Sequence, residues 1–272
     1  MRQLPPAKFR HHTGFTLIEM LAVMAIMITM VALVVPAMIG INTSSNFTTT
    51  AYNIQSIIDQ ARAYAMGGNT YAWVGIAEEN VSFGASQNPQ VPGPGRIAVA
   101  VVTCNDGTRG YDATKTSLPN PAWTNYNNGN SFTALGKLQH FENVHLADFG
   151  ATPPATGGMA RPAIPDPPSG YPNYRLGNAS AAANCVTPFD WPPGSALNAG
   201  QYSFKIVINF DPQGVARIQG AGNTNTVPQY MEIDLQPTHG NVVPAVPANQ
   251  NAGNQAAIQI NGMTGATHLY RP

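Results

Sequence analysis

The feature that most constrains this chain is an apolar stretch near its N-terminus, over residues 15–41. Few polar or helix-breaking residues interrupt it, and after Glu19 no charged residue follows until Asp59. A helix needs about 20 mainly apolar residues to cross a hydrocarbon layer ~30 Å thick, so residues 15–35 are sufficient. We therefore expect a membrane-spanning helix at residues 15–41.

The charges on either side of this stretch predict its orientation. Arg2, Lys8 and Arg10 precede it, and the next basic residue is Arg62. This asymmetry places the N-terminus in the cytoplasm and the rest of the chain outside it. A cleaved secretory signal also has a basic start, but its apolar part usually has about 7–15 residues and a small-x-small cleavage pattern follows. This sequence has a longer apolar stretch and lacks that pattern.

Glu19 is the unusual residue of the apolar stretch. A carboxylate inside a bilayer costs about 2.5–3.5 kcal/mol on insertion scales, so an acid there indicates a function and needs a partner. Neither a secretory signal nor a plain membrane anchor gives it one.

Residues 14–19, with the sequence GFTLIE, resemble the processing site of type IV prepilins and type II secretion pseudopilins. In that family a short basic leader ends in Gly, the mature chain begins with an aromatic residue, and its fifth residue is Glu. A helix-loosening proline commonly follows, and Pro36 stands at the matching position.

The resemblance implies that a prepilin peptidase removes a leader of residues 1–14, cutting between Gly14 and Phe15, and N-methylates Phe15. It also gives Glu19 a partner, because in a filament this carboxylate can pair with the α-amino group of Phe15 on a neighbouring subunit. The other implied partners are further pilins or pseudopilins, an assembly platform in the inner membrane, and lipid. The implied location is the bacterial inner membrane, with one pass and a periplasmic or otherwise extracytoplasmic globular domain.

A second helical pattern follows the polar residues 42–46. Apolar residues recur at spacings of three and four from Phe47 to Ala65, which predicts an amphipathic helix over residues 42–66 that packs on a globular domain. Gly67 and Gly68 mark its end. We expect a soft joint between residues 36 and 46.

The remaining residues, 67–272, predict a β-rich domain. The strand-like runs are residues 70–76, 96–103, 135–149, 201–210, 215–218, 230–235 and 256–260, with a turn at 211–214. Residues 151–194 are rich in proline and lack periodicity, which predicts an irregular insertion. A helix followed by strands indicates an α+β fold, with the helix packed on an antiparallel sheet that carries long Pro/Gly-rich loops, as in pilins.

Four patches between residues 51 and 272 resemble the H-type minor pseudopilins and the FimT-like minor pilins. They are the helix AYNIQSIIDQARAYAM, the turn and strand FDPQGVARI, the strand YMEIDL, and the C-terminal AAIQINGMTGATHLYRP. In the FimT-like group, basic residues near a C-terminal Gly contact DNA, and the matching positions here are His268 and Arg271, near Gly265.

No pattern of catalytic residues or cofactor binding occurs, so we expect a non-enzyme without a cofactor. His140, Glu142 and His145 form the densest group of metal-ligand types, but His145 would point away from the other two in a strand, so we expect no metal site and interpret them as solvated or edge-strand residues. Cys104 and Cys185 could form one disulfide in an oxidising compartment or stay as two buried thiols.

Two functions remain open. The first is structural: a minor pseudopilin or pilin in a short envelope-spanning filament. The second is the capture of DNA by a FimT-like minor pilin. Removing the basic leader leaves the mature chain mildly acidic, which makes nucleic acid an unlikely partner and favours the structural role.

Overall fold

The computed structural model describes residues 16–104, 132–153, 159–167, 173–177, 189–193, 200–219, 225–245 and 254–272. It also describes their side chains, except for residues 33–44, 132, 189, 219 and 225–226. The chain divides into two compact units, Met1–Ser45 and Asn46–Pro272. The second unit contains the sheets and the C-terminal part of the helix, and its fold is α+β.

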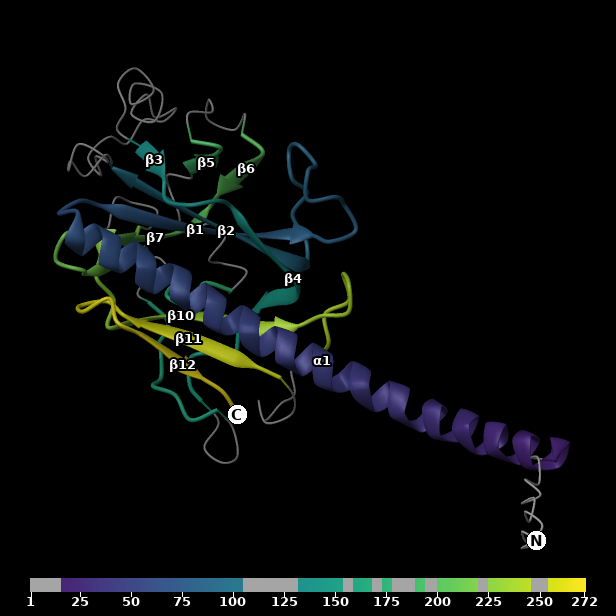
Figure 1. The fold of residues 1–272 in the computed structure, drawn as a ribbon. Coiled ribbons are helices and arrows are strands. Elements are labelled where there is room, and N and C mark those ends of the chain that lie inside the picture. Colours follow the sequence, from purple (N-terminus) through teal and green to yellow (C-terminus); the bar gives the residue numbers. More distant parts are fainter. Residues whose placement is uncertain are drawn as a thin grey trace, which may run out of the picture. The chain divides into compact units, whose positions relative to one another are not determined.

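Helix α1 runs from Leu17 to Gly67 (Figure 1). The joint predicted between residues 36 and 46 does not interrupt the helical backbone. The helix ends at Gly67 as predicted, but the residue that ends it is Asn69, whose φ is 47°. The Thr70 N–H donates to Ala65 O (3.0 Å) and the Asn69 N–H to Met66 O (3.4 Å), which is a Schellman cap.

The strands of the described residues form two antiparallel sheets. Ten of them make the main sheet in the order β12-β11-β10-β4-β2-β1-β7-β8-β9, with β3 paired to β2, while β5 and β6 pair with each other. Their bounds are β1 Ala72–Asn80, β2 Gly95–Cys104, β3 Phe132–Ala134, β4 Gln139–Ala147, β5 Phe189–Trp191, β6 Tyr202–Phe204, β7 Ile206–Phe210, β8 Ala216–Gln219, β9 Asn225–Thr226, β10 Tyr230–Pro237, β11 Ala256–Asn261 and β12 Thr267–Tyr270.

Most of the predicted strands are confirmed, with two corrections. The run 201–210 is not one strand, since the chain enters the main sheet only after Lys205, with β7, and β6 before it pairs with β5. The run 135–149 contains only β4, and a register shift opposite Gly95 and Arg96, together with a φ of 59° at Asn143, changes which residues face the helix. Strands β3, β5, β9 and β12 were not predicted. The predicted turn at 211–214 is confirmed, because the Asp211 carboxylate accepts hydrogen bonds from the Gln213 and Val215 N–H groups.

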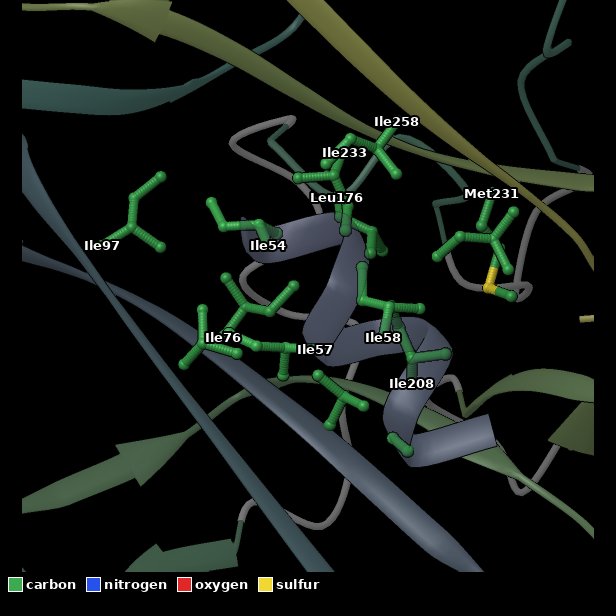
Figure 2. Close-up of a cluster of buried hydrophobic side chains, with 14 of the residues drawn as sticks. Ile54, Ile57, Ile58, Ile76, Ile97, Leu176, Ile208, Met231, Ile233 and Ile258 are labelled. Carbon is green, nitrogen blue, oxygen red and sulfur yellow. The ribbon is translucent and has the colours of Figure 1, made fainter. Parts of the chain in front are cut away.

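The main core lies between residues 46–67 of α1 and one face of the main sheet, which we call the helix face. The predicted apolar stripe is buried, and Ala51, Ile58 and Ala61 are fully covered. In Figure 1, β1, β2 and β7 lie on one side of this helical segment and β10–β12 on the other. Figure 2 shows isoleucines 54, 57 and 58 of α1 pointing toward side chains from both groups of strands, so one stripe joins both halves of the curved sheet.

The opposite, outer face of the main sheet is covered by two elements. Tyr202 and Phe204 of β6 pack against Trp73 and neighbouring side chains of β1 and β2. At the other end, Met159 and Phe149 pack on Ala147 and Ala257 of β4 and β11. Several described residues of the proline-rich insertion are therefore buried parts of the fold.

Candidate assembly segment

The first turn of α1 is closed by a capping box between Thr16 and Glu19. The Thr16 N–H and the Thr16 hydroxyl both donate to Glu19 Oε2 at 2.8 Å, and the Glu19 N–H donates to Thr16 Oγ1 at 3.3 Å. Thr16 thus occupies the N-cap and Glu19 the third helical position, an arrangement that satisfies backbone donors at the start of a helix. The T-x-x-E spacing is the signal in the sequence that could have predicted this helix start. Gly14 and Phe15 lie outside the described residues.

The helical segment that follows exposes its apolar side chains. From Leu17 to Val31 every large apolar side chain is exposed, from 83% for Leu17 to 45% for Val23. Transferring one such side chain from water to an apolar environment is worth about 1.5–3 kcal/mol. The segment therefore gains stability from apolar surroundings, and Glu19 is its one ionisable side chain.

Within the part of the chain that the structure describes, no helix has both the length and the apolarity of a membrane span. The transmembrane helix expected at residues 15–41 therefore stays a prediction. Pro36 lies inside the helical backbone, and its side chain is outside the described residues.

Three of the patches that resemble H-type pseudopilins and FimT-like pilins meet at one place in the second unit. Arg62 of α1 donates from Nε to the carbonyl oxygen of Thr264, at 2.8 Å, in the turn between β11 and β12. Gly265 of that turn lies against the carbonyl oxygen of Gly214, which belongs to the turn between β7 and β8. Arg62 of the helix patch, Gly214 of the FDPQGVARI patch and Gly265 of the C-terminal patch therefore fasten the end of the helix to two hairpin turns.

The two residues expected to contact DNA in the alternative function do not form one surface. Thr267 bonds to α1 through Asp59 and Gln55, and Leu269 packs on the main core, so odd-numbered residues of β12 face the helix. His268 lies on the outer face, 4.4 Å from the Tyr270 ring between centroids. Arg271 donates to Thr48 Oγ1 of α1 (2.7 Å) and to Asn254 Oδ1 (3.3 Å).

The prediction that the HFENVH residues are solvated or belong to an edge strand is confirmed in its first part for His140 and Glu142, which are exposed, whereas His145 is half-buried and the strand is not an edge strand. Strand β4 lies inside the sheet, between β10 and β2, and all three titratable side chains have partners. His140 Nε2 lies 2.6 Å from the Tyr202 hydroxyl, Glu142 pairs with Arg96 at 3.2 Å, and His145 pairs with Glu78. No group of three or more metal-ligand side chains occurs among the described residues.

Tyr202 links β6 to the main sheet through this network. Its hydroxyl donates to Glu79 Oε2 at 3.0 Å, and the Glu79 side chain is 1% exposed. Burial, and then the negative charge of Glu79, raise the pKa of the Tyr202 phenol. The network is structural, since its acids and bases hold β1, β2, β4 and β6 together.

The proposed disulfide stays a prediction. Cys104 is buried at the end of β2, and its carbonyl oxygen accepts a hydrogen bond from the Thr70 hydroxyl. Cys185 lies outside the described residues.

Sequence reasoning missed a buried polar cluster on the outer face of β10 and β11. Glu232 and Asp234 are 0% and 1% exposed, and Arg161, from the proline-rich insertion, pairs with Glu232 at 3.1 Å. The alternation in YMEIDL predicted a strand with one polar face. Nothing local in the sequence indicated that the insertion would cover that face.

Comparison with protein families gives one match. Residues 9–35 match the family described as the prokaryotic N-terminal methylation motif. Comparison with curated proteins and with solved structures gave no match.

Proposed function

We propose that this chain, whose residues 9–35 carry the signature of type IV prepilins and pseudopilins, is a minor subunit of a short filament that spans the cell envelope. The motif supports a pilin-like subunit, and it implies processing by a prepilin peptidase and assembly with other pilin subunits. Our finer proposal is a minor pseudopilin of a type II secretion machine or a minor pilin of a type IV pilus.

The observation that carries this proposal is the segment after the motif's Gly-Phe junction. It is a helix whose described apolar side chains are all exposed, with a single acid in its first turn. An exposed apolar helix of this kind can be covered by lipid before assembly and by the helices of other subunits afterwards.

The position of Glu19 leaves one carboxylate oxygen for a contact with a neighbouring subunit. Its Oε2 atom accepts both hydrogen bonds from Thr16, whereas Oε1 has no partner among the described residues. We propose that cleavage after Gly14 creates an N-methylated amino group on Phe15, and that Oε1 of one subunit binds this cation on its neighbour. A charge-assisted hydrogen bond of this type contributes about 1.5–3 kcal/mol.

We place the protein in the bacterial inner membrane through residues 15–41, with the N-terminus cytoplasmic and the globular domain outside. The charge asymmetry of the flanks supports this orientation. We also propose that the chain is not an enzyme and needs no cofactor, because the titratable clusters of the described residues are engaged in ion pairs and hydrogen bonds that join strands. The assembly platform of the inner membrane is the proposed partner besides other pilins.

The alternative proposal is a FimT-like minor pilin that binds DNA. It has less support, because Arg271 is used in contacts with Thr48 and Asn254 and His268 lies on the other face of β12. Capture of duplex DNA through its phosphates needs several basic side chains on one surface.

The test is expression of the full chain with a prepilin peptidase and the other pilins of its machine. We expect the intact mass of a chain that begins at N-methylated Phe15. The variant Glu19→Gln keeps the size of the side chain and removes its charge, so we expect normal cleavage but at least about tenfold less crosslinking to other pilins, since 1.4 kcal/mol corresponds to a factor of ten.

Glu142→Gln is the matched control, because it removes an acid that is 60% exposed and lies in the globular domain. We expect it to assemble like the unmodified chain. A mature N-terminus at another residue would contradict the processing proposal. Equal crosslinking of Glu19→Gln and Glu142→Gln would remove the role given to Glu19.

A further inference from the structure

Residues 159–167 of the proline-rich insertion lie over the outer face of β10 and β11. Residues 173–177 lie beside β10, where Leu176 packs in the main core (Figure 2). We call these two described parts of the insertion, 159–167 and 173–177, the strap. Residues 174–176 add to the sheet beside β10: the Leu176 N–H donates to Glu232 O (2.8 Å) and the Glu232 N–H to Tyr174 O (2.9 Å). Met159 and Ile164 are its apolar anchors, at 0% and 1% exposed. The strap is therefore part of the folded unit, although its sequence has no regular pattern.

Two arginines hold the strap to the sheet. Arg161 pairs with Glu232 of β10 and donates to Gly150 O at 3.0 Å. Arg175 pairs with Asp148 at 2.8 Å and with Asp166 at 2.7 Å. Both arginines of the strap are therefore paired with carboxylates.

Asp234 forms no ion pair with a basic side chain of the described residues. It is 1% exposed, and the Phe149 N–H donates to its Oδ2 atom at 2.8 Å. Within the described part of the chain, its Oδ1 atom has no hydrogen-bond partner as a carboxylate, and neither does Oε1 of Glu232 apart from its ion pair with Arg161. The two residues are two positions apart on one strand, so their side chains lie on the same face. An unpaired buried carboxylate beside another acid is costly, and a proton on Asp234 that is donated to Glu232 removes the cost.

The groups that surround this pair come from every neighbouring element. The charged and titratable groups are Arg161, Asp166 and Arg175 of the strap, Asp148 after β4, Tyr230 of β10, and His268 and Tyr270 of β12. Strand β11 contributes the uncharged Gln259, whose side-chain amide donates to Glu232 Oε2 at 2.7 Å. The cluster therefore contains four acids and two arginines, which leaves an excess of negative charge when every acid is ionised.

We propose that Glu232 and Asp234 share one proton when the strap is closed, and that closure of the strap is coupled to the uptake of that proton. The strap is then a pH-sensitive cover of an acidic sheet face. It stays closed while the pair holds the proton, and it opens more often as the pH rises.

The direction of the pH dependence follows from the environment of the pair. Burial, followed by the charge of Glu232, raises the pKa of Asp234 well above its ordinary value, and burial also raises the pKa of Glu232. When the strap opens, water reaches both carboxyls and their pKa values return toward normal. The closed state thus binds one proton more than the open state at any pH between the ordinary pKa of an aspartate, about 4, and the raised one. Closure is favoured most at low pH and is lost as the pH rises through the raised pKa.

The experiment is hydrogen exchange on the full chain in detergent micelles, from pH 5 to pH 9, with exchange rates corrected for the intrinsic effect of pH. We follow the amides of Ile164, which donates to Ala151 O, and Leu176, together with β1–β2 amides as reporters of global opening. We expect the opening constant of the strap to rise by close to tenfold per pH unit until it levels off, while β1–β2 stays protected. In Asp234→Asn the rise should disappear.

Asp166→Asn is the matched control, because it removes an acid of the strap that is 73% exposed. It should keep the pH dependence, even if the strap opens more often at every pH. A strap opening constant in the unmodified chain that is flat or falls with pH overturns the proposal, whether or not Asp234→Asn folds. So does a parallel loss of protection in β1–β2, since the proton would then stabilise the whole fold rather than the strap. Retention of the full dependence in Asp234→Asn excludes the proposed proton site.

Discussion

Replacing Gly265 by alanine tests whether the junction of Arg62, Gly214 and Gly265 fastens the helix to the two hairpin turns. Gly265 has a φ of 66°, a conformation that costs an alanine about 1–2 kcal/mol. An added Cβ would also overlap the carbonyl oxygen of Gly214 and lie 2.9 Å from Arg62 Cδ. Because one of these neighbours is backbone, the turns must move, and overpacking of this kind costs a further 1–3 kcal/mol or so.

The matched control is Gly136→Ala. Gly136 has a φ of 82°, but nothing lies within 4 Å of its added Cβ, so it isolates the cost of the backbone conformation. We therefore expect the free energy of unfolding to fall by about 1–2 kcal/mol in Gly136→Ala and by about 2–5 kcal/mol in Gly265→Ala.

The assay is denaturant unfolding of the full chain in detergent micelles, followed by the fluorescence of buried Trp73. The Arg62→Ala variant is a second test of the junction in the same assay, because it removes the hydrogen bond to Thr264 without creating a steric overlap. If Gly265→Ala and Gly136→Ala lower the stability equally, the close packing of the two turns does not matter and the reasoning is refuted.

Two further predictions concern the second unit. Arg271→Ala should lower the free energy of unfolding by about 1–3 kcal/mol, because it leaves Thr48 and Asn254 without this donor. In an anisotropy titration at physiological salt, we expect the unmodified chain and Arg271→Ala to bind duplex DNA equally, with a Kd no tighter than about 10⁻⁴ M. Micromolar binding by the unmodified chain that is lost in Arg271→Ala would favour the DNA alternative. Ile58→Ala should cost about 2–5 kcal/mol in chemical unfolding, since Ile58 is 0% exposed in the core under α1, and Tyr52→Ala, on the exposed face of the same helix, should cost far less.

Several features of the fold could be predicted because their causes are local. The stripe from Phe47 to Ala65 follows the helical period, and it is the buried stripe of α1. Residues 96–103 and 230–235 carry the side-chain types of strands, and both form strands. The turn after Phe210 follows from Asp211, whose own carboxylate bonds the backbone of the next residues.

The errors arose where a distant partner overrides the local pattern. Nothing near Lys205 in the sequence shows that Tyr202 and Phe204 lie outside the main sheet, because the reason is their packing on Trp73, far away in the chain. The place of the HFENVH strand inside the sheet could not be predicted for the same reason, since a strand's place in the sheet order depends on which other strands pair with it. Strand β12 is too short to give a recognisable alternation, and its pairing with β11 defines it.

The N-terminal segment is the part of this protein whose character can be read from the order of its residues. Residues 9–35 match the methylation motif because a processing site is recognised as a linear string, and the charge pattern around residues 15–41 is likewise linear. The role of Glu232 and Asp234, in contrast, exists only in the folded chain. In the sequence they are the polar half of an alternating strand, which usually faces water. They are buried because Arg161 and Arg175, more than fifty residues earlier in the chain, bring the insertion over them, and no local propensity encodes that contact.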